Sequence, residues 1–225
     1  GATFHEQGNY PAALEQLQQA LTTAQETRLL PDEVYILNNI GRTYYEQGQY
    51  EKATEVFQKG LELGQQLGQK IDQAVALSGF SLVKLDQGQY DQAFDYAQQS
   101  LTLFQETGVK ASEASLLVLI GRIQLTRGNY AEAINAKQQA LAINQDIGDK
   151  DEEAYALQQL GSTYSQLGQY DRALELNQQA LTIAQEIGDR PREASALDAI
   201  ANIYAQQQQY DQALDYHDQA LTIWR

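Results

Sequence analysis

Apolar and small residues recur along the chain at helical spacing, and the pattern returns every forty residues. A tyrosine is followed by an alanine three positions later, and a small residue and a leucine stand seven and eight positions after that alanine. These offsets lie on one face of an α-helix. The tyrosines are Tyr10, Tyr50, Tyr90, Tyr130, Tyr170 and Tyr210.

A second apolar stripe precedes each tyrosine. One helical face carries Val34, Leu37, Ile40, Gly41 and Tyr44. Later repeats hold similar residues at the equivalent positions, and each set of equivalent positions is called a column below. Between the two stripes stands a turn, EQGQY in its first full form, whose glycine takes a positive φ without a Cβ clash. Each repeat is therefore predicted to be a helix A, a tight turn, a helix B and a linker, which gives an all-α fold of antiparallel helix pairs.

The ends of the predicted B helices also carry signals. We expect a left-handed glycine after each helix B, and Asp149 and Asp189 suit the start of the next helix A. The glycines are Gly68, Gly108, Gly148 and Gly188. Because no linker rich in Gly, Ser or Pro interrupts the pattern, we expect one continuous array. Its parts are a partial repeat 1–31 and the repeats 32–71, 72–111, 112–151, 152–190 and 191–225. Residues 1–7 match only the end of a helix A, so we expect the parent protein to continue at one or both ends.

The columns carry a family resemblance. Gly41, Tyr44, Tyr50, Ala53 and Phe57, followed by Gly60, reproduce the spacing of the tetratricopeptide repeat. The chain resembles the forty-residue variety found in kinesin light chains, Pins-type adaptors and large bacterial arrays. The resemblance implies a right-handed α–α superhelix whose A helices line a concave groove for protein partners. The family's carboxylate clamp has lysine and asparagine at the columns of Asn38 and Arg42, so recognition of chaperone tails is not implied here.

Composition narrows the function. The net charge of −15 disfavours nucleic acid and anionic membranes as partners, because both are negatively charged. Cysteine is absent, which excludes disulfides and thiolate metal sites. No apolar run approaches the length of a membrane span. We expect a cytoplasmic protein without a cofactor.

Few residues offer catalytic chemistry. The two histidines, His5 and His217, stand at opposite ends of the chain, and no phosphate-binding loop or nucleophile elbow is present. Carboxylates gather before one helix A, at a spacing that fits helix capping and misses the calcium-loop pattern. These are Asp146, Asp149, Asp151, Glu152 and Glu153. We predict that the chain is not an enzyme.

The candidate binding residues come from the helix A columns that the core leaves free. They are Tyr35, Asn38, Asn39, Arg42, Tyr45, Leu82, Val118, Arg122, Gln158, Ser162, Asp198 and Asn202. Arg42 and Arg122 suit acidic groups of a partner; the alternative is that each pairs with a neighbouring acid. The third and fourth A helices add an apolar centre that would bind apolar side chains. It consists of Val75, Leu82, Leu85, Val118 and Leu125.

The apolar centre has a second interpretation. The core tyrosine column is Lys84 and Gln124 in these repeats, so Leu85 and Leu125 could have taken over its packing.

Two functions follow from these observations. The first is a protein-interaction module that holds a peptide or helical segment, apolar with acidic residues, in the groove. The alternative is a structural scaffold that positions a fused domain or associates end to end. A group of glycines in the second and third repeats indicates either close helix packing or a flexible joint. These glycines are Gly60, Gly64, Gly68 and Gly79.

Overall fold

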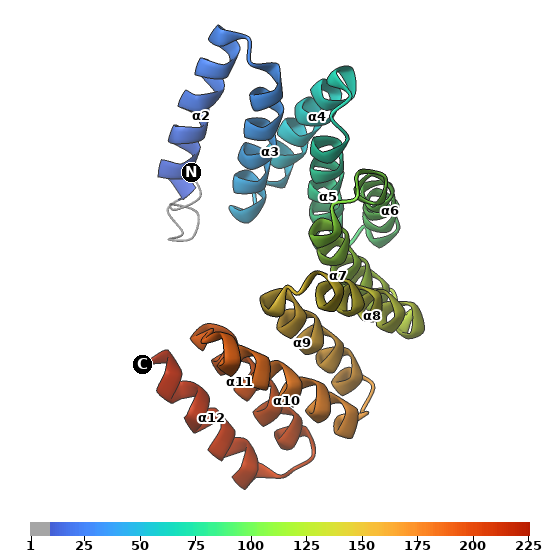
Figure 1. The fold of residues 1–225 in the computed structure, drawn as a ribbon, viewed down its shortest axis with the longest axis vertical. Coiled ribbons are helices and arrows are strands. Elements are labelled where there is room, and N and C mark those ends of the chain that lie inside the picture. Colours follow the sequence, from blue (N-terminus) through green and yellow to red (C-terminus); the bar gives the residue numbers. More distant parts are fainter. Residues whose placement is uncertain (1–9) are drawn as a thin grey trace. The chain divides into compact units, whose positions relative to one another are not determined.

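The computed structural model describes residues 10–225, which form eleven α-helices and no strand (Figure 1). The predicted end of a helix A at residues 1–7, and His5, lie outside the described residues. The described helices alternate between B and A types, which confirms the predicted all-α array of antiparallel helix pairs.

The chain divides into two compact units, Gly1–Val109 and Lys110–Arg225. The first unit contains α2 (Tyr10–Thr27), α3 (Leu30–Glu46), α4 (Tyr50–Leu67), α5 (Lys70–Asp86) and α6 (Tyr90–Thr107). The second contains α7 (Lys110–Thr126), α8 (Tyr130–Ile147), α9 (Lys150–Gln166), α10 (Tyr170–Ile187), α11 (Arg190–Gln206) and α12 (Tyr210–Trp224). The expectation of one continuous array remains a prediction.

The turn and cap signals act as the sequence predicts. The turn glycine Gly48 has a φ of +70°, and Gln208 takes a φ of +64° in the last turn, where the glycine is missing. Gly68 ends α4 in the left-handed conformation, as do its counterparts at the ends of α6, α8 and α10. At the start of α9, the Asp149 carboxylate accepts a hydrogen bond from Glu152 N at 3.1 Å. This confirms the capping interpretation for Asp149.

The repeating columns form the core. The alanine three positions after each turn tyrosine is buried in every described helix B, from Ala13 in α2 to Ala213 in α12. Within each unit, A helices of successive repeats lie in contact: α3 with α5, α7 with α9, and α9 with α11. The A helices therefore share one face of each unit, and the groove columns belong to this face.

Glycines of α3 and α5 make room for one large side chain. Phe57 of α4 is buried between Gly41 and Gly79, and a Cβ on Gly41 would lie 2.7 Å from its ring. A Cβ on Gly79 would also overlap this ring. A Cβ on Gly60 would lie 2.8 Å from Asn38 Oδ1. Close packing thus accounts for Gly60 and Gly79.

Candidate functional site

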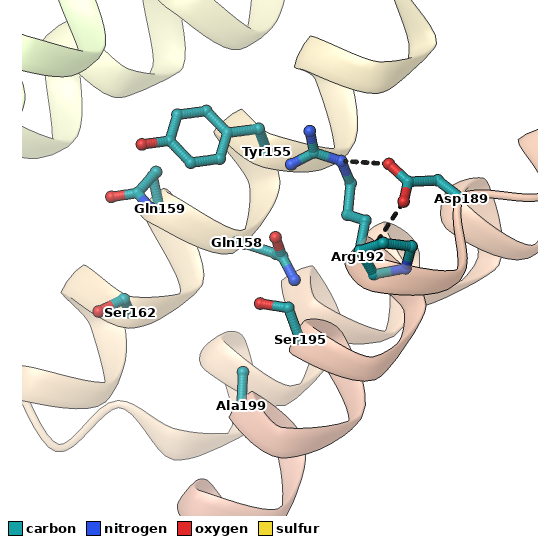
Figure 2. Close-up of a pocket in the computed structure, with 9 residues that line it drawn as sticks. Tyr155, Gln158, Gln159, Ser162, Asp189, Arg192, Ser195 and Ala199 are labelled. Atoms are coloured by element: carbon teal, nitrogen blue, oxygen red, sulfur yellow. Dashed lines mark hydrogen bonds and ion pairs between the residues drawn. The ribbon is translucent and has the colours of Figure 1, made fainter. Parts of the chain in front are cut away.

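The A-helix face of the second unit contains a hollow of about 440 Å³ between α9 and α11 (Figure 2). Tyr155, Gln158 and Ser162 of α9 line it from one side, and Ser195 of α11 lines it from the other. All four belong to the groove columns of their repeats. Gln158 and Ser162 are also among the predicted binding residues, so the structure brings these two together.

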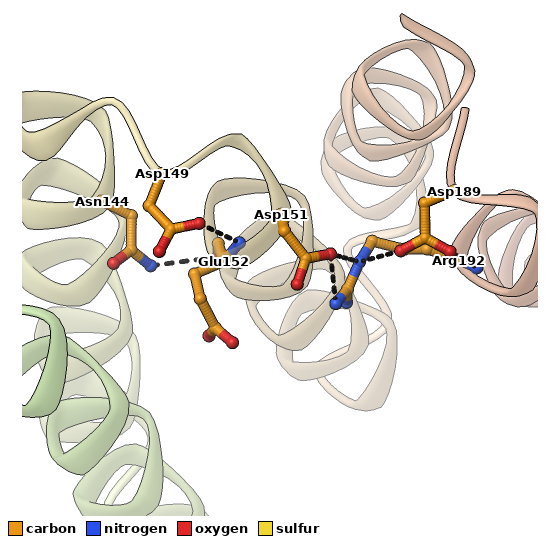
Figure 3. A network of polar contacts seen from close by, with 6 residues as sticks. All are labelled: Asn144, Asp149, Asp151, Glu152, Asp189 and Arg192. Carbon is orange, nitrogen blue, oxygen red and sulfur yellow. Dashed lines mark hydrogen bonds and ion pairs between the residues drawn. The ribbon is translucent and has the colours of Figure 1, made fainter. Parts of the chain in front are cut away.

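Arg192 of α11 forms a wall of the hollow, and two acids hold its guanidinium (Figure 3). Its Nη2 lies 2.7 Å from Asp151 Oδ1, and its Nε lies 3.3 Å from Asp189 Oδ2. The guanidinium carbon also lies 5.6 Å from the centre of the Tyr155 ring. Because the protein's own carboxylates neutralise Arg192, its role in the hollow is to fix the wall.

Asp189 has a second partner in the same network. Its Oδ1 accepts a hydrogen bond from Arg192 N at 3.0 Å and so caps α11. This backbone hydrogen bond, with the side chains of Asp151 and Arg192, lowers the pKa of Asp189. Burial, followed by the negative charge of the neighbouring Asp151, raises the pKa of Glu152. Three carboxylates of the group therefore have partners within the protein, which agrees with the capping interpretation over the calcium one: Asp149, Asp151 and Glu153.

Gln158 supplies a hydrogen-bond donor that the protein leaves unused. Its Nε2 is buried and has no acceptor among residues 10–225. A buried donor without an acceptor is destabilising by about 1–3 kcal/mol. Rotation of the Gln158 side chain would bring this donor to a carbonyl oxygen of a ligand in the hollow.

The family model of the tetratricopeptide repeat matches residues 1–66, 72–146, 112–186 and 152–225. The chain belongs to the tetratricopeptide-repeat family. A search of curated protein sequences finds no match.

Solved structures share the tetratricopeptide fold at low sequence identity. BtubC from P. vanneervenii is 16% identical with a TM-score of 0.82, over 95% of this chain and 90% of its own. Kinesin light chain repeats from Podosopora anserina are 18% identical with a TM-score of 0.71, over 86% and 95%. Aspartyl phosphate phosphatase F from Bacillus subtilis is 15% identical with a TM-score of 0.78, over 100% and 68%. At these identities the likeness shows the fold alone.

In the second tetratricopeptide repeat, the predicted asparagines make internal contacts. Asn38 is only 3% exposed, and its Nδ2 donates to Asp72 O at 3.0 Å. Asn39 is partly buried and donates to Tyr35 O at 2.8 Å. Asn38 therefore joins two repeats through its own side chain, and a groove ligand would not reach it.

Of the other predicted residues of this repeat, one is exposed to solvent and two contact acidic side chains of the protein. Tyr35 is 64% exposed. The Tyr45 hydroxyl donates to Asp86 Oδ2 at 2.7 Å. Arg42 Nε lies 3.2 Å from Glu46 Oε1, one helical turn away, which is the alternative considered for it.

The apolar centre is split between core and surface. In α5, Leu85 is buried, Leu82 is partly buried and Val75 is exposed. In α7, Val118 is buried and Leu125 is partly buried. The packing interpretation therefore holds for Leu85, and Val118 also lies in the core.

Arg122 differs from Arg42. It is exposed on α7, and no carboxylate among residues 10–225 pairs with it. The residue one turn later, where Glu46 stands in α3, is Thr126, whose hydroxyl donates to Arg122 O at 3.0 Å. Arg122 is thus the predicted groove arginine whose charge is left free.

Two predicted residues lie on α11 beyond the hollow. Asp198 Oδ1 is 2.9 Å from His217 Nδ1 of α12, and Asn202 is exposed. His217 is itself half-exposed.

Arg192 is a site residue that the sequence did not predict. Its partner Asp151 stands one repeat earlier. An acid and a base at neighbouring positions of successive repeats were the signal from which this ion pair could have been predicted.

No metal site and no membrane span are found in the part of the chain that the structure describes. None of its His, Asp and Glu side chains form a group of three or more suited to a metal ion. None of its helices is both long and apolar enough to cross a bilayer.

Proposed function

We propose that this tetratricopeptide protein binds a peptide segment of a partner protein on its A-helix face. The observation that supports this most is the hollow between α9 and α11, where Gln158 Nε2 is buried and finds no acceptor in the described part of the chain. Membership of a family of protein-interaction repeats agrees with it.

The chemistry of the hollow suits peptide backbone. Gln158 donates to a backbone carbonyl, and the hydroxyls of Ser162 and Ser195 can each donate and accept. Tyr155 offers an aromatic surface for an apolar side chain. Arg192 is held in place before the ligand arrives, so ordering this wall adds no cost on binding.

Selection from a random-peptide display library on the purified protein tests the proposal. We expect enriched peptides whose affinity falls about tenfold in a Gln158→Leu variant, because one hydrogen bond is lost. Gln178→Leu makes the same change on the exposed face of α10 and should leave affinity intact. Absence of enriched peptides on the wild-type protein would contradict the proposal.

A structural scaffold is the second candidate, and the last helix supports it. On α12, Leu221 and Trp224 are exposed, whereas Leu181 and Ala184 in the same columns of α10 are buried. This face of α12 would accept another helix. Sedimentation velocity should then show association that rises with concentration and is lost in Trp224→Glu. A monomer at all concentrations would exclude self-association through α12.

A further inference from the structure

Lys137 of α8 is a buried lysine in a column that holds neutral residues in the neighbouring repeats. The equivalent residues of α4, α6 and α10 are Phe57, Ala97 and Asn177. Lys137 is 2% exposed and lies against Gly121 of α7, where an added Cβ would be 2.6 Å from Lys137 Cγ. Glycine at this position of helix A therefore leaves room for the aliphatic part of Lys137, as Gly41 leaves room for the Phe57 ring.

Among residues 10–225, the ammonium of Lys137 donates only to neutral groups. Its Nζ donates to Gln159 O at 3.0 Å and to Thr163 Oγ1 at 2.8 Å, both on α9. Lysine is rarely buried unless a carboxylate pairs with it, because an unpaired charge loses its hydration. Burial, followed by the charge of Arg122, lowers the pKa of Lys137 to about 8.

Arg122 and Lys137 thus place two positive charges at the junction of α7 and α9, and no acid of residues 10–225 pairs with either. Arg122 is the charged group of α7 that acts on Lys137, and α9 presents neutral oxygens to its ammonium. The chain holds 30 acidic residues, yet Thr126 stands where an acid would neutralise Arg122. A negative group from outside the chain would relieve the repulsion between the two cations.

We propose that Arg122 and Lys137 form a subsite for an aspartate or glutamate side chain of the bound peptide. The proposal rests on the proposed function and specifies the chemistry of the partner. Arg122, which is exposed, contacts the carboxylate. Lys137 contributes its charge from beneath, across a junction where little water screens it.

The arrangement predicts a reciprocal effect. If an acidic side chain binds more tightly when Lys137 is protonated, its binding must raise the pKa of Lys137 by the same coupling. A lysine that only ties α8 to α9 would show no such shift. Lysine-selective NMR of the wild-type protein, with and without peptide, therefore separates the two roles.

The experiment uses peptides enriched by the display selection, synthesised with glutamate and with glutamine at each acidic position. We expect the glutamate form to lose at least about tenfold in affinity, or 1.4 kcal/mol, in Arg122→Gln and in Lys137→Met. The glutamine form should bind all proteins alike. Arg172→Gln removes an equal charge from the exposed side of α10 and serves as the control.

Each outcome bears on the proposal. Equal binding of the glutamate and glutamine forms by the wild-type protein would overturn the subsite and leave the proposed function standing. Loss of binding on amidation of the peptide C-terminus, without an effect of glutamine, would assign the site to a terminal carboxylate and contradict a side-chain site. If Lys137→Met unfolds, Lys137→Asn, which places the residue of α10 in the same column, takes its place. Absence of any enriched peptide would overturn both proposals.

Discussion

Phe57 and Lys137 occupy the same column of helix B, one in each unit. Each side chain fills a space, called the slot below, that the glycine of the preceding helix A leaves open: Gly41 for Phe57 and Gly121 for Lys137. In α4 the slot holds an aromatic ring, which lies 6.0 Å from the ring of Phe80 and joins an apolar cluster. In α8 it holds an ammonium with neutral partners. The repeat therefore determines the shape of the slot, and its occupant determines whether the slot contributes stability or charge.

Removing the ring tests the stabilising half of this comparison. Phe57→Ala should lower the free energy of unfolding by about 3–5 kcal/mol, because it leaves a cavity between two glycines. Urea denaturation measures the effect. A loss below about 1 kcal/mol would mean that the surrounding helices close the gap.

The pH dependence of stability tests the charged half. The pKa of Lys137 is about 8 in the folded protein, against 10.5 for an unperturbed lysine, which represents the unfolded chain. Between these values the unfolded chain binds a proton that the folded chain lacks, so stability rises as pH increases. The gain should reach about 3 kcal/mol between pH 8 and 10.5.

Comparison of the wild type with Lys137→Met separates the gain in stability due to Lys137 from the effects of other titrating groups. The variant should be more stable than the wild type at pH 7, and the difference should shrink as the pH rises. Gln159 O still accepts the Thr163 hydroxyl at 3.0 Å, so the substitution leaves neither of these two groups unsatisfied. Parallel pH profiles of the two proteins would show that Lys137 is not strained by burial.

The two glycine slots should also respond differently to a methyl group. Gly79→Ala drives a Cβ into a ring that Gly41 confines on its other side, and overpacking of this kind costs about 1–3 kcal/mol. Gly121→Ala meets the lysine stem, which can shift, although Ala133 O lies 3.1 Å from the added Cβ. Thermal unfolding should therefore rank Gly79→Ala as the more damaging variant. The reverse order would imply that the stem of Lys137 is the more rigid occupant.

The smallest effect concerns the last turn, where Gln208 replaces glycine. Gln208→Gly should stabilise the protein by about 1 kcal/mol, since a left-handed φ is costly for residues with a Cβ. Gln207→Gly is the matched control, because its φ of −80° needs no glycine and the change should not stabilise. Equal melting temperatures for wild type and Gln208→Gly would show that this turn carries no strain.

The fold was predictable because its signals are local. Helix faces, turn glycines and the Asp149 cap depend on residues a few positions apart, and the repeat presents each signal several times. The candidate site was predictable only in part. Gln158 and Ser162 lie in the hollow as their columns suggest. Asn38 and Val118 lie in equally promising columns, yet both are buried.

The contacts that the sequence did not indicate join residues far apart in the chain. Arg192 reaches Asp151 in the preceding repeat, and Lys137 reaches Gln159 and Thr163 in the following one. Column position alone does not tell whether a side chain meets solvent or the next repeat, because this depends on how successive helices pack.

The charge of Lys137 is the central claim, and its pKa is the most direct measurement. NMR of lysine-labelled protein, with Lys137→Met to assign the signal, gives the pKa of this side chain in the folded state. A value near 8 is predicted, and it should rise in Arg122→Gln because a neighbouring positive charge is removed. A value near 10.5 that Arg122→Gln leaves unchanged would contradict a buried, unneutralised ammonium at this site.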